Sequence, residues 1–168
     1  MSRLRSQYEA SARYNRWMNE RLYALAELVG DQDRKRDRGA FFGSIHGTLN
    51  HILLGDRVWL ARFGAGEALA VKSLGDELFA DFDELRRERT KTDDVIATFM
   101  ASLDGEKLDG PLRYTRAGET IEHPLWWAVG HLFNHQTHHR GQLTTLFSQL
   151  GHDPGVTDMI AFLRENAG

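Results

Sequence analysis

Four long stretches of this 168-residue chain place apolar side chains three and four residues apart, which is the spacing of one face of an α-helix. Gly30, Gly64 and Gly151 are stop signals after three of these stretches. Ser44 suits the N-cap of the second stretch, and Pro124 suits the first turn of the fourth. The predicted helices span about Leu4–Leu28, Ser44–Arg62, Asp76–Leu103, where the pattern allows a break near Thr90, and Pro124–Leu150.

The segment between the third and fourth predicted helices has a different pattern. Leu112–Thr115 and Thr120–Glu122 are two short runs of strand-forming residues, and Ala117-Gly118 lies between them. Strand-forming runs on either side of a short glycine-containing turn are typical of a hairpin. The sequence therefore predicts a small β-hairpin before the fourth helix.

The chain ends with a turn and one more short helix. Asp153-Pro154-Gly155 indicates the turn, and Thr157 can cap a helix that continues to Leu163. Four long helices in a chain of this length predict an all-α fold, namely a four-helix bundle with a short β-hairpin before the fourth helix and a short C-terminal helix. No repeat or linker interrupts the pattern, so residues 1–168 are expected to form a single domain.

The charge distribution argues against a nucleic-acid partner. The formal net charge is −3, whereas binding to nucleic acid needs clustered cations. The basic run Arg34–Arg38 is interrupted by Asp33 and Asp37, so we expect it to be a solvated loop. No apolar stretch approaches the roughly 20 residues that span a bilayer, and Met1–Glu9 is too polar for a secretory signal. The expected location is the cytoplasm, without a membrane partner.

The chain contains no cysteine, which excludes a disulfide framework, a thiolate zinc site and a cysteine nucleophile. It also has no H-E-x-x-H motif, no glycine-rich phosphate loop after a strand and no G-x-S-x-G motif. The metalloprotease, nucleotide-binding and serine-hydrolase patterns are therefore missing. Any thiol that takes part in the chemistry of this chain must come from another molecule.

Histidines are numerous and unevenly placed. The chain has eight, and five of them lie between His123 and His139. Histidines four residues apart lie one turn apart on one helix face, where two imidazoles can bind the same metal ion. His131 with His135, and His135 with His139, have this spacing. On a helical wheel, His139 lies on the apolar face and His135 at its edge. His131 and His138 lie further toward solvent, so the second pair is predicted to bind the metal.

A third ligand is expected, because two imidazoles hold a metal ion weakly. His51 lies beside an apolar flank of the second predicted helix, whereas His46 lies on the polar face of that helix. Bundles commonly build metal sites from facing helices, which favours His51. A lone buried histidine is more often a hydrogen-bonded core residue, and that alternative stays open for His51. Imidazole suits zinc, nickel, copper and iron, so we expect a divalent transition metal, such as zinc, nickel or iron, whose identity the spacing does not determine.

Two other polar residues have alternative roles. Asp56 lies on the apolar face of the second helix, where a buried carboxylate needs a partner. We favour a structural hydrogen bond, and the alternative is that Asp56 orients a neighbouring group. Arg140 flanks the predicted ligands and can either bind an anionic substrate group or pair with an acidic residue. No catalytic residue is assigned from the sequence.

Three stretches of the chain resemble a known protein family. They are residues 14–22 (YNRWMNERL), residues 47–53 (GTLNHIL) with Asp56 and Trp59 following, and residues 134–142 (NHQTHHRGQ) continued by residues 150–155 (LGHDPG). These stretches are similar to those of the DinB-like, or DNA-damage-inducible, family of metal-binding bundle proteins. The resemblance implies a four-helix bundle with a three-histidine metal site at His51, His135 and His139. Related proteins include transferases and isomerases that use a metal-bound low-molecular-weight thiol, and many are homodimers.

Two classes of function are compatible with these observations. The first is a metal-dependent enzyme that acts on an unknown small-molecule substrate by activating a low-molecular-weight thiol, as an S-transferase, or water, as a hydrolase. The second is a non-catalytic metal-binding or stress-related protein in which the ion is structural or sensory. Structural zinc usually has four protein ligands, so three predicted ligands favour an enzyme. We also expect a homodimer.

Overall fold

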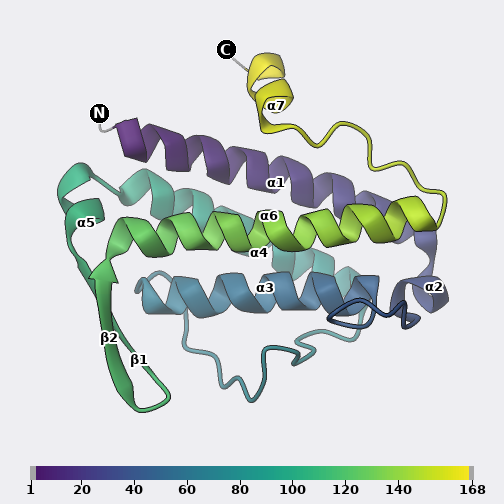
Figure 1. The fold of residues 1–168 in the computed structure, drawn as a ribbon, viewed down its shortest axis with the longest axis horizontal. Coiled ribbons are helices and arrows are strands. Elements are labelled where there is room, and N and C mark those ends of the chain that lie inside the picture. Colours follow the sequence, from purple (N-terminus) through teal and green to yellow (C-terminus); the bar gives the residue numbers. More distant parts are fainter. Residues whose placement is uncertain (1–2, 167–168) are drawn as a thin grey trace.

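The computed structural model describes residues 3–166, and its framework is a bundle of four long helices (Figure 1). They are α1 (Arg3–Val29), α3 (Ile45–Arg62), α4 (Phe82–Ser102) and α6 (Leu125–Gln149). Helix α1 packs against α4 and α6, and α3 packs against the same two helices, so the four helices close into a bundle. The predicted fold class is confirmed, and α1, α3 and α6 have bounds close to the predicted ones.

The third long helix differs from its prediction. Helix α4 begins after Asp81 rather than near Asp76, and it continues without a break at Thr90. The side chain of Asp81 accepts a hydrogen bond from a backbone N–H in the first turn at 2.8 Å, which makes it the N-cap. The preceding residues instead run along α3, where the backbone N–H of Phe79 donates to Oδ1 of Asn50 at 3.0 Å. This contact fixes the segment before α4 against α3 and outside the helix.

A two-stranded antiparallel hairpin precedes α6, as predicted. Its strands β1 (Pro111–Arg116) and β2 (Glu119–Pro124) are longer than the predicted runs. Ala117 and Gly118 have φ angles of 51° and 83°, which is the left-handed backbone that a two-residue hairpin turn requires. The short helix α5 (Gly105–Asp109) leads into the hairpin, which projects from one end of the bundle beside α3 and α6 (Figure 1).

The basic run after α1 is only partly a solvated loop, since Lys35 and Arg36 are exposed but Arg34 is not. Residues Asp31–Lys35 form the short helix α2, and Arg34 is only 5% exposed. Its Nη1 donates to the Ala26 carbonyl at 2.6 Å, and its guanidinium lies 3.7 Å from the ring centroid of Phe82. The prediction was wrong for Arg34 because its partners lie on α1 and at the start of α4, which the local charge pattern does not reveal.

The final short helix, α7 (Met159–Glu165), begins after Asp158 rather than after Thr157. The carboxylate of Asp158 accepts hydrogen bonds from two backbone N–H groups of the first turn, at 2.6 and 3.0 Å, so Asp158 is the N-cap. The carbonyl of Thr157 instead accepts a hydrogen bond from the Tyr14 hydroxyl at 2.6 Å. That bond attaches the C-terminal segment to α1.

A layer of buried polar side chains divides the core. On α3, Leu53 belongs to one apolar cluster and Leu60 to another, and Asp56 lies between them. Arg89 of α4 forms ion pairs with Asp56 and Asp93, with N···O distances of 2.5 and 2.9 Å. All three charged residues are at most 5% exposed. Among the helices of residues 3–166, none combines the length and apolar character needed to cross a membrane.

Candidate metal centre

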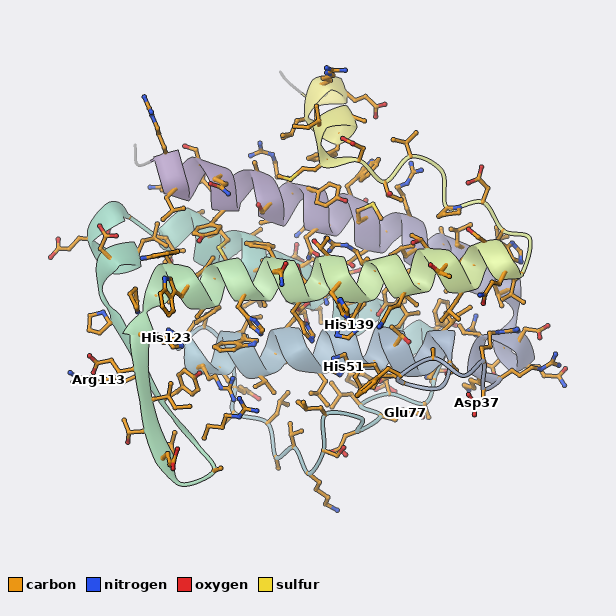
Figure 2. The ribbon with its side chains drawn as sticks, in the orientation of Figure 1. Asp37, His51, Glu77, Arg113, His123 and His139 are labelled. Atoms are coloured by element: carbon orange, nitrogen blue, oxygen red, sulfur yellow. The ribbon has the colours of Figure 1, made fainter. Side chains whose placement is uncertain are left out.

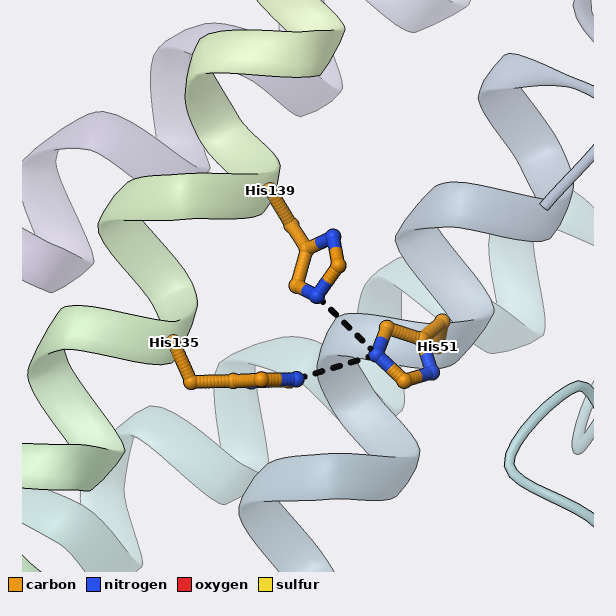
Figure 3. Close-up of side chains that lie close together, drawn as sticks. All are labelled: His51, His135 and His139. Atoms are coloured by element: carbon orange, nitrogen blue, oxygen red, sulfur yellow. Dashed lines mark hydrogen bonds between the residues drawn. The ribbon is translucent and has the colours of Figure 1, made fainter. Parts of the chain in front are cut away.

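Three histidine side chains from two facing helices point toward one another. Figure 2 places His51 and His139 where α3 and α6 face each other, and Figure 3 shows all three rings. His51 comes from α3, and His135 and His139 lie one turn apart on α6. Nε2 of His51 is 2.9 Å from Nε2 of His135 and 3.2 Å from Nε2 of His139. The structure thus brings together the three residues that the sequence singled out.

The other ring nitrogens determine which tautomers are present. Nδ1 of His51 is 2.7 Å from the Leu74 carbonyl, which can only accept, so the proton of His51 lies on Nδ1. Nδ1 of His139 likewise donates to Oε1 of Gln142 at 2.8 Å. Both rings therefore present an Nε2 lone pair to the cluster. The 3.2 Å contact between these two nitrogens is repulsive unless a cation lies between them.

The geometry and the protonation of the cluster both suit a metal ion. Two imidazole nitrogens 2.0–2.1 Å from one ion, at angles of about 90–110°, lie about 2.9–3.4 Å apart. Both short contacts of His51 fall in that range. Burial lowers the pKa of all three imidazoles, and for His135 burial, His139 and His51 lower the pKa to about 3. Neutral imidazole is the form that binds metal, so the cluster can hold a metal ion.

Gly55 and Phe42 pack directly against the cluster, and neither was singled out by the sequence. A Cβ at position 55 would lie 2.8 Å from Cε1 of His135, so a side chain there would displace the ring. Nδ1 of His135 faces this glycine and is buried without a hydrogen-bond partner among the described residues. The Phe42 ring stacks on His51 with centroids 3.6 Å apart. The only sequence feature that pointed to this close packing was a glycine one turn after His51 on α3.

Asp56 has the structural role favoured above. It is fully buried, and its Oδ1 accepts a hydrogen bond from Nε2 of Gln136 at 2.8 Å. Its Oδ2 accepts from Nη1 of Arg89 at 2.5 Å. Burial raises the pKa of Asp56, and the attraction of Arg89 opposes that shift. Gln136 follows His135 along α6, so the buried network lies directly behind the histidine cluster.

His46 was placed on the polar face of its helix, and that prediction is wrong. His46 is 1% exposed, and its Nε2 is 2.9 Å from the Phe79 carbonyl. The same carbonyl accepts a hydrogen bond from Asn50, another residue of the predicted polar face. The segment before α4 covers this side of α3. His46 nevertheless lies outside the three-histidine cluster, and that it is not a ligand stays a prediction.

Two other histidines and one arginine flank the cluster. His131 and His138 are exposed, as the wheel predicted. Arg140 is 3% exposed, so an external anion cannot readily reach it. Its guanidinium donates to the side chains of Asn15 and Thr137, and it forms no ion pair with a carboxylate within residues 3–166. The ion pair considered for Arg140 is therefore not formed, burial disfavours the anion-binding alternative, and the contact with Asn15 joins α6 to α1.

Sequence comparisons assign the chain to a family. It matches the family model described as DinB family over residues 1–167. It is also similar to Protein DinB of Bacillus subtilis (strain 168), with 24% identity over 156 residues. That alignment covers 89% of this chain and 90% of the relative. The family match includes the parts of α3 and α6 that carry the histidine cluster. The chain therefore belongs to the DinB family.

Proposed function

We propose that this chain is a metal-dependent enzyme in which His51, His135 and His139 hold one divalent transition-metal ion. The observation that carries the proposal is the convergence of three Nε2 atoms, two of which have their proton on the opposite nitrogen. Membership of the DinB family supports it. Three protein ligands leave coordination positions open, which is typical of catalytic rather than structural sites.

The proposed reaction uses a small nucleophile. A divalent ion held by three imidazoles supplies a Lewis acid that lowers the pKa of a thiol or water bound beside it. The Leu74 carbonyl and the Gln142 amide hold two of the rings with Nε2 directed into the site. The Phe42 ring covers one face of His51 and limits access of water there. Because the chain has no cysteine, an S-transferase would need a separate low-molecular-weight thiol, whereas a hydrolase would need only water.

Turnover of the metal-loaded protein tests this function. Zinc-, nickel- and iron-loaded samples are assayed with electrophilic acceptors, with and without a low-molecular-weight thiol. Turnover only with thiol indicates an S-transferase, and turnover without it indicates a hydrolase. His51→Ala is the blank because it removes the α3 member of the cluster. His46→Ala is the matched control, since His46 is also a buried histidine of α3 but lies outside the cluster.

Metal content is measured on the same samples by elemental analysis. We expect wild type and His46→Ala to retain the metal and His51→Ala to lose it. Equal metal content in all three samples would show that the ligand assignment is wrong. If wild type retains metal but no acceptor is turned over above the blank across a broad panel, the enzyme proposal fails. A structural or sensory ion is then the better account.

We also propose a homodimer in the cytoplasm. Homodimers are common among the proteins that the sequence resembles, and several large apolar side chains are exposed. Leu28, Trp127 and Ile160 are 71%, 56% and 56% exposed. A second copy can cover such residues. Sedimentation velocity at micromolar concentrations should show a dimer, and a single monomeric species would contradict the proposal.

A further inference from the structure

Arg62, at the end of α3, is a half-buried cation without an acidic partner. Its guanidinium carbon lies over the rings of Trp59 and Tyr114, 4.5 Å from each centroid. Within residues 3–166 it forms no ion pair and donates no hydrogen bond. Arg57 is half-buried and Arg89 is buried, and unlike Arg62 both of them pair with carboxylates. The donors of Arg62 therefore remain free for an acceptor from another molecule.

The charges around Arg62 favour an anion. Burial lowers the pKa of Arg62, Arg116 adds to that shift, and Tyr114 opposes it. Burial and then the charge of Arg62 lower the pKa of His131. Arg116 thus acts on Arg62 as a second cation, and no carboxylate of the described residues forms an ion pair with Arg62. A bound anion would relieve this local excess of positive charge.

A row of aromatic rings connects Arg62 with the histidine cluster. The Trp59 ring, which lies under the Arg62 guanidinium, is 5.1 Å from the ring of His131. His131 in turn is 5.9 Å from His135, a member of the cluster. The row follows the pair of helices α3 and α6, and each step is a direct ring contact. One small molecule lying along this row could touch both the cluster and Arg62.

The hairpin borders the far end of this row. Tyr114 of β1 packs 5.6 Å from Trp59 and also 5.6 Å from His123 of β2. The exposed Trp127 at the start of α6 packs against His123 with centroids 6.4 Å apart. In Figure 2, His123 lies at the hairpin end of α6, and His139 of the cluster lies further along that helix, facing His51 of α3. The hairpin therefore contributes side chains next to Arg62.

We propose that Arg62 binds the carboxylate of an elongated small molecule whose other end reaches the three-histidine cluster. This inference rests on the proposed function and names the class of molecule that uses the site, a thiol with a distant carboxylate. The Cα atoms of His51 and Arg62 are separated by about 16 Å along α3. Both side chains lean toward the N-terminus of α3, which leaves this separation nearly unchanged. The ring contacts between Arg62 and the cluster are 4.5, 5.1 and 5.9 Å, so the two ends of the ligand are on the order of 15 Å apart. The rings of Trp59 and His131 contact its middle.

The test compares two peptides by isothermal titration calorimetry on zinc-loaded protein. The peptide Cys-Gly-Gly-Gly, about 13–14 Å long when extended, is used with a free C-terminal carboxylate and as the C-terminal amide. The acid should bind wild type about tenfold more tightly than the amide, because a hydrogen bond between two charged groups is stronger than one to a neutral group. Arg62→Gln should bring that ratio to about one and leave the zinc content unchanged. Arg87→Gln removes an exposed charge on α4 and should keep the tenfold ratio.

Three outcomes would overturn the inference. They are equal binding of the two peptides to wild type, binding of neither peptide, and an unchanged ratio in Arg62→Gln. The proposed enzyme is judged by other measurements, namely metal content and turnover. Loss of the acid preference while zinc is retained would therefore refute only the carboxylate subsite. An acid preference that Arg62→Gln abolishes would support the subsite even in a protein without measurable turnover.

Discussion

Replacing Gly55 by alanine tests whether the histidine cluster needs a close approach of α3 to α6. A Cβ at this position would lie 2.8 Å from Cε1 and 3.3 Å from Nδ1 of His135. Unstrained carbon–carbon contacts are about 3.5–4.0 Å, so the His135 ring must move by roughly 0.7 Å or more. Metal–ligand distances tolerate only about 0.2 Å. His135 would then no longer share one ion with His51 and His139.

The same substitution should leave the fold intact. Alanine is favoured over glycine inside a helix by about 1 kcal/mol, which offsets part of the cost of moving the ring. The Tm of the metal-free protein should therefore change by only a few degrees. Loss of a residue that merely orients a ligand lowers metal affinity about 10–100-fold, and displacement of the ligand itself should cost at least as much. Gly55→Ala thus separates metal affinity from stability.

Gly141→Ala on α6 is the matched control. Nothing lies within 4 Å of a Cβ at that position, so this variant should gain about 1 kcal/mol of stability and keep its metal affinity. A gain of that size corresponds to roughly 2–4 °C in Tm. Zinc affinity is measured by competition with a chromophoric chelator, and Tm by circular dichroism on metal-free protein. Zinc affinity in Gly55→Ala equal to that of wild type would refute the reasoning.

Alanine at either α6 histidine of the cluster should remove most of the bound metal, whereas His46→Ala should retain it, as elemental analysis after gel filtration can show. Asp56→Ala should destabilise the protein by about 3 kcal/mol in denaturant unfolding, because it leaves Arg89 with Asp93 alone. Glu122→Gln should cost less than about 1 kcal/mol, because its ion pair with Arg113 in the hairpin is exposed. Acid should destabilise the metal-free protein, because burial lowers the pKa of His46 and of the three cluster histidines below the unfolded value of 6.5, so the unfolded chain binds these protons first. Their contribution to stability is complete above pH 6.5 and is lost as the pH falls below it. His46→Ala should weaken the pH dependence of Tm only in part, and an unchanged pH dependence in that variant would contradict a contribution from His46.

The sequence was sufficient for features that depend on one helix at a time. The apolar spacing that defines a helix is local, so the bounds of α1, α3 and α6 could be predicted closely. The spacing of His135 and His139 needed only the repeat of an α-helix. His51 required one further assumption, that its helix faces α6, and the wheel supported it. These residues could be identified from the sequence because each prediction involved at most two helices.

Other residues depend on segments whose path the sequence does not show. His46 and Asn50 read as a polar face, but the chain before α4 supplies the Phe79 carbonyl that both of them contact. Gly55 has no side chain to signal a role, and its importance comes from a ring on the facing helix. The sequence shows Arg62 only as the last residue of a helix, because its contact with Tyr114 depends on where the hairpin lies.

The buried pair of Gln136 and Asp56 explains how the two helices keep the ligands in register. Each follows a residue of the site, Gln136 after His135 and Asp56 after Gly55, and successive helical residues point about 100° apart. The histidines therefore face one another on one side, while the Gln136–Asp56 hydrogen bond lies in the core. Sliding α6 by one turn would move His135 about 5.4 Å along α3 and deprive Asp56 of this donor. Since Arg89 ties the same carboxylate to α4, a shifted register would leave buried charge incompletely paired, at a cost of several kcal/mol. We infer that the polar layer, which adds little net stability by itself, excludes other registers and so positions the three imidazoles before any ion binds.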